Sequence, residues 1–189
     1  MINPAFRGRN ATILCPYDVN GLEPVVIEDA AATHPVLIER GSVRPSSAYA
    51  PARITARYNY RLPRPSDPPT FAFDVARLRH ARRFAVQQGR LAGLNDDRLD
   101  DLLLIAGELV ANSLRHGGGS GTLRVWPEDR HLICEVDDAG RIDDPLVGRH
   151  PADSHQLSGR GLLVVNDLAD LVRMHTRSDG VTVRAYLRL

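Results

Sequence analysis

A helical segment that ends in a run of glycines constrains the fold of this 189-residue sequence more than any other feature. Apolar residues recur at steps of three and four from residue 99 to residue 114, which predicts an amphipathic helix beginning at Asn95. The glycines at 117–119 predict where this helix ends. Glu108 and Asn112 lie four residues apart, so their side chains share one face of the helix. A carboxylate there can accept a proton, and an amide oxygen can ligate a hard cation such as Mg²⁺.

Two later motifs add the other features that a nucleotide site requires. Asp138 and Gly140 place a carboxylate in a tight turn after a predicted strand, and the neighbouring Asp137 should face the opposite side of that strand. A further helix is predicted to open with the run Gly159, Arg160, Gly161 and Leu162. Because its start carries few bulky side chains, its backbone N–H groups can bind phosphate.

Each of these motifs also has an ordinary structural explanation. A glutamate and an asparagine on one helix face are typical of a solvated surface, and Asp-x-Gly and Gly-x-Gly are common in turns and loops. The order of the three motifs along one chain favours a nucleotide site with a metal ion. The polar segment 141–158 fits a lid over that site better than a metal centre, because its acidic and histidine residues match no metal-ligand spacing, namely Asp143, Asp144, His150, Asp153 and His155.

Composition excludes several classes of function. The net charge is +1, which gives no electrostatic footprint for nucleic acid or for an anionic membrane. All 24 basic residues are arginine, so a mechanism that needs lysine, such as one that uses the P-loop lysine or a Schiff base, is excluded. No apolar run approaches the length that spans a bilayer. Cys15 and Cys134 lack metal-ligand or disulfide-framework spacing and are interpreted as free thiols of a reducing cytosol, which places the protein in the cytoplasm.

The sequence divides into three parts. Residues 1–60 contain too few apolar residues for a core, with a strand expected over 12–15 and a helix over 23–33. Residues 61–70 carry four prolines and no periodicity, which predicts an extended interdomain linker. Residues 71–189 are predicted to form a compact domain.

The expected elements of this domain are a strand, two helices, two strands, a loop, a helix and two strands. The helices are placed at 74–88, broken by Gly89 and Gly93, then from Asn95 to the glycines at 117–119, and from 159 or 161 to 168. The strands are placed at 71–73, 122–126, 131–137, 171–176 and 181–187. This order predicts an α+β fold, a two-layer α/β sandwich with a mostly antiparallel sheet and helices on one face.

With these motifs, the sequence resembles the Bergerat-fold ATPases of the GHKL superfamily over residues 71–189. The form Glu-Leu-Val-x-Asn-x-x-x-His-Gly at 108–117 is similar to the anti-sigma factor serine kinases, the RsbW/SpoIIAB group. The resemblance implies binding of ATP and Mg²⁺, with Asn112 as the Mg²⁺ ligand and Glu108 as the general base. It implies an adenine site at Asp138, Gly140 and Thr182, with the carboxylate accepting from the exocyclic amine. The phosphates are then expected at Gly159, Arg160, Gly161 and Leu162.

The same resemblance implies an ATP-binding anti-sigma regulatory factor. Such a protein phosphorylates a serine or threonine of an anti-anti-sigma (STAS) protein, sequesters a sigma factor, and can form a homodimer. Two alternatives stay open from the residues alone. One is a protein-binding module that ATP switches without catalysis, and the other is the catalytic part of a histidine kinase. The second lacks a phosphoacceptor helix pair, because His80 has no acidic neighbour and is interpreted as a surface residue.

The N-terminal part resembles the end of a MEDS sensory domain, which precedes such an ATPase in RsbA-type regulators. The residues that carry this resemblance are Ile-Leu-Cys-Pro-Tyr-Asp at 13–18 and Thr-His-Pro at 33–35. The resemblance implies that only the tail of that domain is present.

Overall fold

A computed structural model describes residues 10, 12–142, 144, 147–149 and 160–189 of the chain. The chain divides into two compact units, Met1–Tyr60 and Arg61–Leu189. Each unit is described by itself. Among the described residues, none of the helices combines the length and the apolar character needed to cross a bilayer.

The N-terminal unit consists of two helices and a hairpin. Helix α1 spans Pro24–Thr33, strands β1 and β2 span Val36–Glu39 and Ser42–Pro45, and helix α2 spans Pro51–Arg57. The hairpin turn uses positive φ angles at Arg40 and Gly41. The expected helix is present, but residues 12–15 form no strand. Ala30 and Ala32 are the buried apolar side chains in the described part of this unit, so its apolar core is small.

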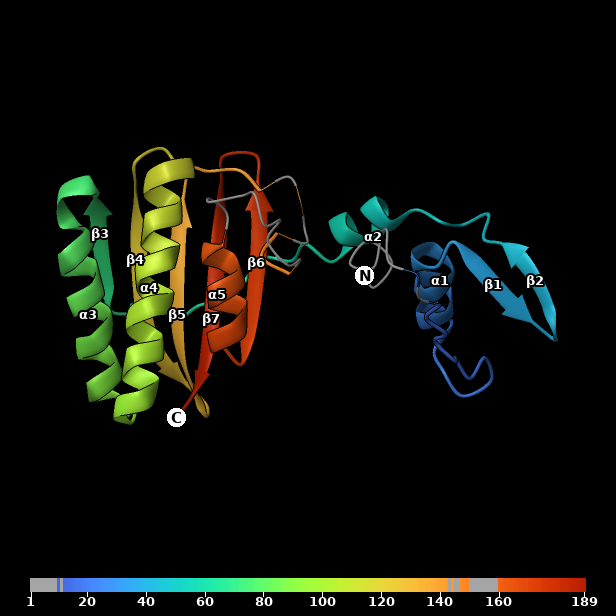
Figure 1. The fold of residues 1–189 in the computed structure, drawn as a ribbon, viewed down its shortest axis with the longest axis horizontal. Coiled ribbons are helices and arrows are strands. Elements are labelled where there is room, and N and C mark those ends of the chain that lie inside the picture. The colour runs from blue at the N-terminus through green and yellow to red at the C-terminus, as the bar shows by residue number, and fades with distance from the viewer. Residues whose placement is uncertain (1–9, 11, 143, 145–146, 150–159) are drawn as a thin grey trace. The chain divides into compact units, whose positions relative to one another are not determined.

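The C-terminal unit is an antiparallel sheet covered on one face by helices, as predicted (Figure 1). Its sheet has the strand order β3-β4-β5-β7-β6, and each neighbouring pair is antiparallel. The strands are β3 (Thr70–Asp74), β4 (Ser120–Glu128), β5 (His131–Asp138), β6 (Leu171–Arg177) and β7 (Gly180–Arg188). The helices are α3 (Leu78–Leu91), α4 (Asp96–His116) and α5 (Gly161–Leu168), with a 3₁₀ turn, η2, at Val75–Arg77.

The core lies between the helices and one face of the sheet. Alternate residues of β5, Leu132, Cys134 and Val136, join this core, whereas Ile133 and Glu135 lie on the other face of the sheet. On α4 the buried positions recur at helical spacing, at Leu102, Ile105, Ala106 and Leu109 among others. The hydrophobic pattern of the sequence therefore sets which side of each element is buried.

Helix α3 continues through Gly89, where the sequence predicts a break. A Cβ atom at this position would lie 2.6 Å from Leu102 Cδ2 and 2.8 Å from Leu99 Cδ2. Glycine at this position of α3 therefore allows α4 to approach closely. The packing of the two helices outweighs the low helix propensity of glycine. The helix ends near Gly93, which has φ +86°. The side chain of Asn95 then caps α4 by accepting a hydrogen bond from the Arg98 backbone N–H.

Residues 61–69, called the strap below, cross the face of the sheet that carries no helix. The backbone oxygen of Pro63 accepts a hydrogen bond from Arg184 on β7, and that of Pro69 accepts one from the Val125 backbone N–H on β4. Leu62 and Pro68 are buried. The structure therefore groups the segment predicted as an interdomain linker with the C-terminal unit, and bonds it to the sheet.

Candidate functional site

The start of α5 lies against the polar pair on α4. A Cβ atom at Gly161 would lie 2.5 Å from Glu108 Oε2 and 3.2 Å from both amide atoms of Asn112. A residue other than glycine would therefore displace these side chains. The structure thus brings Gly161 next to the pair Glu108 and Asn112, which lies about 50 residues earlier in the sequence.

Arg115 also contacts this pair. Its Nη2 donates a hydrogen bond to Asn112 Oδ1 at 3.2 Å and lies 4.0 Å from Glu108 Oε2. Arg115 is not among the predicted site residues, although the spacing of three residues from Asn112 to Arg115 indicates neighbours on a helix. A guanidinium group therefore accompanies the carboxylate and the amide at this point of the site.

Asp138 is held in place from two sides at the end of β5. Its Oδ1 accepts a hydrogen bond from the Gly140 backbone N–H at 2.7 Å, and its Oδ2 accepts one from the hydroxyl of Ser113. A Cβ atom at Gly117 would lie 2.5 Å from Asp138 Cγ, and one at Gly140 would lie 2.7 Å from Asp138 Oδ1. The two glycines therefore make room for a carboxylate whose position is fixed. Ser113 is a further site residue that the sequence analysis did not single out.

A cavity of about 250 Å³ connects these groups. Its walls combine apolar side chains of α4, β5 and β7 with a few polar groups, which is the character of sites for small organic ligands. The lining residues are Leu109, Asn112, Ser113, His116, Gly117, Val136, Asp138, Gly140, Arg141, Ile142, Asp144, Val147, Leu162, Val181 and Val183. Asn112 and Asp138 thus face one cavity, and Leu162 from α5 lines it as well.

The predicted lid contributes to this cavity where the structure describes it. Arg141, Ile142, Asp144 and Val147 line one side. A Cβ atom at Gly148 would lie 2.5 Å from Leu162 Cβ, so Gly148 packs against the start of α5. Among the residues considered as metal ligands, Asp143, His150, Asp153 and His155 lie outside the described residues, as does Gly159. Arg160 is described and exposed, and its side chain makes no hydrogen bond that caps α5.

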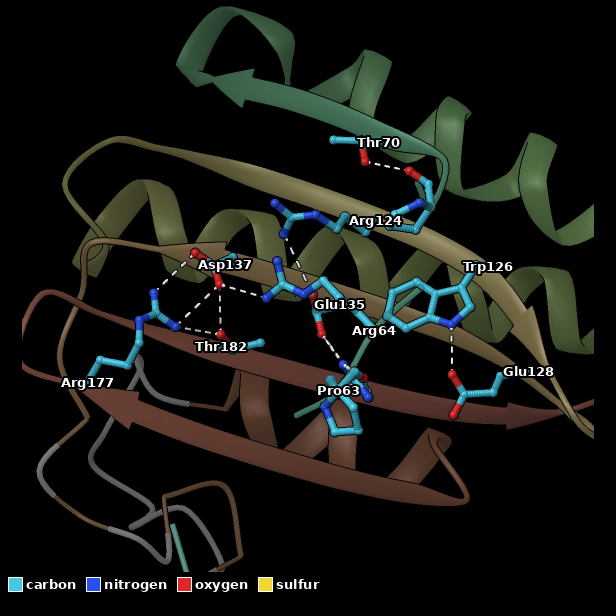
Figure 2. A network of polar contacts seen from close by, with 12 residues as sticks. Pro63, Arg64, Thr70, Arg124, Trp126, Glu128, Glu135, Asp137, Arg177 and Thr182 are labelled. Carbon is cyan, nitrogen blue, oxygen red and sulfur yellow. Dashed lines mark hydrogen bonds and ion pairs between the residues drawn. The ribbon is translucent and has the colours of Figure 1, made fainter. Parts of the chain in front are cut away.

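Thr182 does not belong to this cavity, which corrects the prediction that it closes an adenine pocket. Its hydroxyl donates a hydrogen bond to Asp137 Oδ2 at 2.7 Å on the opposite face of the sheet, where Asp137 and Thr182 are cross-strand partners (Figure 2). Successive residues of a strand point to opposite faces, so Val181 and Val183 line the cavity instead. Asp137 faces away from the cavity as expected.

Asp137, on the sheet face opposite the cavity, is kept charged by its neighbours. Burial pushes the pKa of this carboxyl upward, but the hydrogen bond from Thr182 and the positive charges of Arg177 and Arg64 outweigh it, so the pKa is lowered. Arg177 Nη2 donates to Asp137 Oδ1 at 3.2 Å, and Arg64 Nη2 donates to Asp137 Oδ2 at 3.4 Å. Asp137 is therefore an anion, and three side chains hold it.

The groups at the cavity fit a nucleotide with its metal ion. Asn112 offers one amide oxygen, which suits Mg²⁺ because this ion keeps most of its octahedral shell for phosphate and water. Gly161 leaves the space beside Glu108 and Asn112 free of a side chain. Within the described residues, no cluster of three or more histidine, cysteine or acidic side chains offers an all-protein metal site.

The family model of the histidine kinase-like ATPase domain matches residues 71–187. It does not reach residues 1–70, so the resemblance of the N-terminal part to a sensory domain stays a prediction. A search of curated proteins gave no match.

Solved structures with a similar fold include the RsbU and RsbW domains of a protein from Mycobacterium tuberculosis. That structure has a TM-score of 0.50 and 19% identity, over 66% of this chain and 32% of its own. This chain therefore spans about a third of that relative, and the likeness shows the fold alone. The SiaB–SiaC complex from Pseudomonas aeruginosa matches with a TM-score of 0.48 and 12% identity, over 75% of this chain and 100% of its own.

Proposed function

Because the chain belongs to the histidine kinase-like ATPase domain family, we propose that residues 71–189 bind ATP together with Mg²⁺. One observation carries this proposal. The carboxylate and amide of α4 lie beside the glycine that opens α5, and the amide of Asn112 lines an apolar cavity that Asp138 also lines. A metal ligand, a helix start and a hydrogen-bond acceptor for a base are therefore arranged around one small space.

Each group has a distinct role in this proposal. Asp138 accepts a hydrogen bond from the exocyclic amine of adenine, while Ser113 and Gly140 hold its carboxylate in place. Asn112 ligates Mg²⁺, which when bound neutralises phosphate charge. Backbone N–H groups at the start of α5 hold the phosphates, because the positive end of the helix dipole and its free donors favour anions.

Glu108 is proposed as the general base for transfer of the γ-phosphoryl group to a serine or threonine hydroxyl of a protein. Such transfer depends on positioning and electrostatic stabilisation more than on covalent catalysis. The motif at 108–117 supports the anti-sigma kinase group, so we propose a STAS anti-anti-sigma protein as substrate and a sigma factor as the sequestered partner. A cytoplasmic homodimer is part of the same proposal.

The position of Arg115 favours a second candidate function. Its guanidinium contacts both Asn112 and Glu108, so both side chains of the pair already have a partner within the protein. In that case ATP acts as a switch that orders the site and changes affinity for a partner, without phosphoryl transfer.

Titration of the chain with ATP, followed by heat release, tests the first step. ATP with Mg²⁺ is expected to bind, whereas GTP should bind weakly because it presents a carbonyl to Asp138. Equal binding of ATP and GTP would refute the adenine assignment. Incubation with radiolabelled ATP and a cognate STAS protein then separates the two candidates, since only the kinase labels that protein.

A further inference from the structure

The strap covers charged side chains on the open face of the sheet. Beneath it Arg184 donates two hydrogen bonds to Glu135 Oε2, from Nε at 2.9 Å and from Nη2 at 2.6 Å. Arg64 of the strap adds an ion pair, with its Nε 3.3 Å from Glu135 Oε1 (Figure 2). Glu135 and Arg184 are 0% and 1% exposed although no helix lies over them. Residues 61–69 contribute to this burial, together with the ring of Trp126, whose centroid lies 5.0 Å from Arg184 Cζ.

A segment that covers charged side chains costs less free energy to release than a segment that covers an apolar core. Buried charges lose hydration energy, and water restores it when the cover leaves, which offsets part of the lost contacts. The main apolar core lies on the other face of the sheet and stays covered when the strap departs, whereas Leu62 of the strap and Trp126 on β4, both buried, are then exposed. Contacts of Arg64 with Glu135 and Asp137 thus hold a segment whose release the sheet can tolerate.

Asp137 joins the strap to the candidate nucleotide site. It receives hydrogen bonds from Arg64 on the strap, from Arg177 on β6 and from Thr182 on β7. The next residue is Asp138, which points into the cavity on the other face. The backbone is also tightly packed here, because a Cβ atom at Gly180 would lie 2.2 Å from the Asp138 carbonyl oxygen. The end of β5 is therefore held on the strap face by the contacts of Asp137 and on the cavity face by the contacts of Asp138.

We infer that Arg64 is a positioning residue for the adenine site, and that the strap regulates ATP affinity through Asp137. With the strap bound, the end of β5 holds the Asp138 carboxylate where adenine needs it. With the strap released, Asp137 loses one of its three partners and Asp138 loses part of its support. This inference rests on the proposed function, since it names how the same nucleotide site is regulated. By thermodynamic linkage, ATP must in turn favour the bound strap.

Replacement of the strap contact tests this inference on the full chain. Arg64→Gln removes the charge and keeps most of the side chain, and Arg61→Gln is the matched control. Arg61 is exposed and makes no hydrogen bond or ion pair within the part of the chain that the structure describes. For Arg64→Gln we expect about threefold weaker ATP binding, in the range of one partly exposed ion pair. Binding of tripolyphosphate, which has no adenine, should not change.

The single tryptophan of the chain reports the strap directly. Trp126 is 2% exposed and lies on the face that the strap crosses, with its ring centroid 5.0 Å from Cζ of Arg184 (Figure 2). Acrylamide should quench its fluorescence more strongly in Arg64→Gln than in the unchanged protein, and ATP should reduce quenching in the unchanged protein. Thr182→Val removes a different contact of Asp137, so it should weaken ATP binding without exposing Trp126.

The outcomes separate this inference from the proposed function. If the unchanged protein binds no ATP, the nucleotide assignment itself fails. If it binds ATP and Arg64→Gln binds equally well, the positioning role is refuted, whatever Trp126 shows. If ATP and tripolyphosphate weaken together, Arg64 acts through general stability, which also contradicts the inference. Arg64→Lys, which keeps one charge, should recover part of the ATP affinity, and no recovery would count against an ion-pair role.

Discussion

Ser113→Ala is the substitution that most directly tests how the adenine site is built. Ser113 is 1% exposed, and its hydroxyl donates to Asp138 Oδ2. A hydrogen bond to a charged group contributes about 1.5–3 kcal/mol. Asp138 is half-buried and keeps its bond from Gly140, so the lower end of this range applies. Alanine regains about 0.5 kcal/mol of helix propensity in α4, which leaves a net loss of roughly 1 kcal/mol.

Ser113→Ala should weaken ATP binding by more than it lowers the stability of the fold. Without the serine, one bond from Gly140 holds the Asp138 carboxylate, which can then rotate away from the cavity. We expect about tenfold weaker ATP binding, equivalent to 1.4 kcal/mol. The melting temperature should fall by roughly 3–5 °C. Calorimetric titration and thermal unfolding measure the two quantities on the same preparation.

Asp138→Asn provides the matched comparison. It keeps the shape of the side chain but replaces an acceptor oxygen with a donor, so adenine should lose its partner even more completely. Ser113→Ala with unchanged ATP affinity would show that the serine does not position Asp138 for a ligand. An equal loss of GTP and ATP affinity would place the base elsewhere.

Four further experiments have outcomes that the structure specifies. Asn112→Ala should abolish Mg²⁺-dependent ATP binding, whereas Glu108→Ala should spare binding and remove turnover; ATP affinity that survives Asn112→Ala would refute the metal assignment. Arg184→Met leaves Glu135 buried with two weaker arginine contacts, so urea unfolding should show a loss of about 3 kcal/mol, while the double change with Glu135→Met should restore most of it. Because the pKa of Asp137 is lowered in the folded state, its ionisation stabilises the fold above the unfolded pKa of about 3.9, and this stabilisation is lost as pH falls through the folded pKa. The midpoint of unfolding should therefore fall more steeply with acid in the unchanged protein than in Thr182→Val. Burial raises the pKa of Cys134 to about 12, so a thiol reagent at pH 8 should modify Cys15 in the folded protein and Cys134 only after unfolding.

The sequence predicts the fold well where local pattern and tertiary packing agree. Helix α4 begins after Asn95 and ends at the glycines, because the capping side chain, the apolar spacing and the glycine run all specify the same boundaries. Gly89 is the opposite case. Its local preference predicts a break, but contact with Leu99 and Leu102 makes glycine the residue that fits inside the helix. A prediction from residues close in the sequence cannot include Leu99 and Leu102, because they lie on the neighbouring helix.

The motifs predict the candidate site in outline, and tertiary contacts complete it. Glu108 and Asn112 on α4, Asp138 at the end of β5 and Gly161 at the start of α5 come from three segments, yet the structure places them in one region. Ser113 and Arg115 escaped notice because a serine and an arginine on a helix are ordinary, and only the folded chain shows which groups they reach. The strap is similar, since four prolines indicate an extended segment but not the sheet face along which it runs.

The misplacement of Thr182 follows from the period of a strand. Side chains alternate between faces with a period of two, so an assignment shifted by one residue moves a side chain from the cavity to the other side of the sheet. The pairing of β5 with β7 decides the matter, because it sets Thr182 opposite Asp137 and Val181 opposite Asp138. Asp138 faces the cavity, so its partner Val181 must face it too, and the threonine must join Asp137 behind the sheet. Once Asp137 and Asp138 are assigned to opposite faces of the sheet, the face of residue 182 is determined. A polar residue at this position lies on the face that the strap crosses, where it can bond to Asp137.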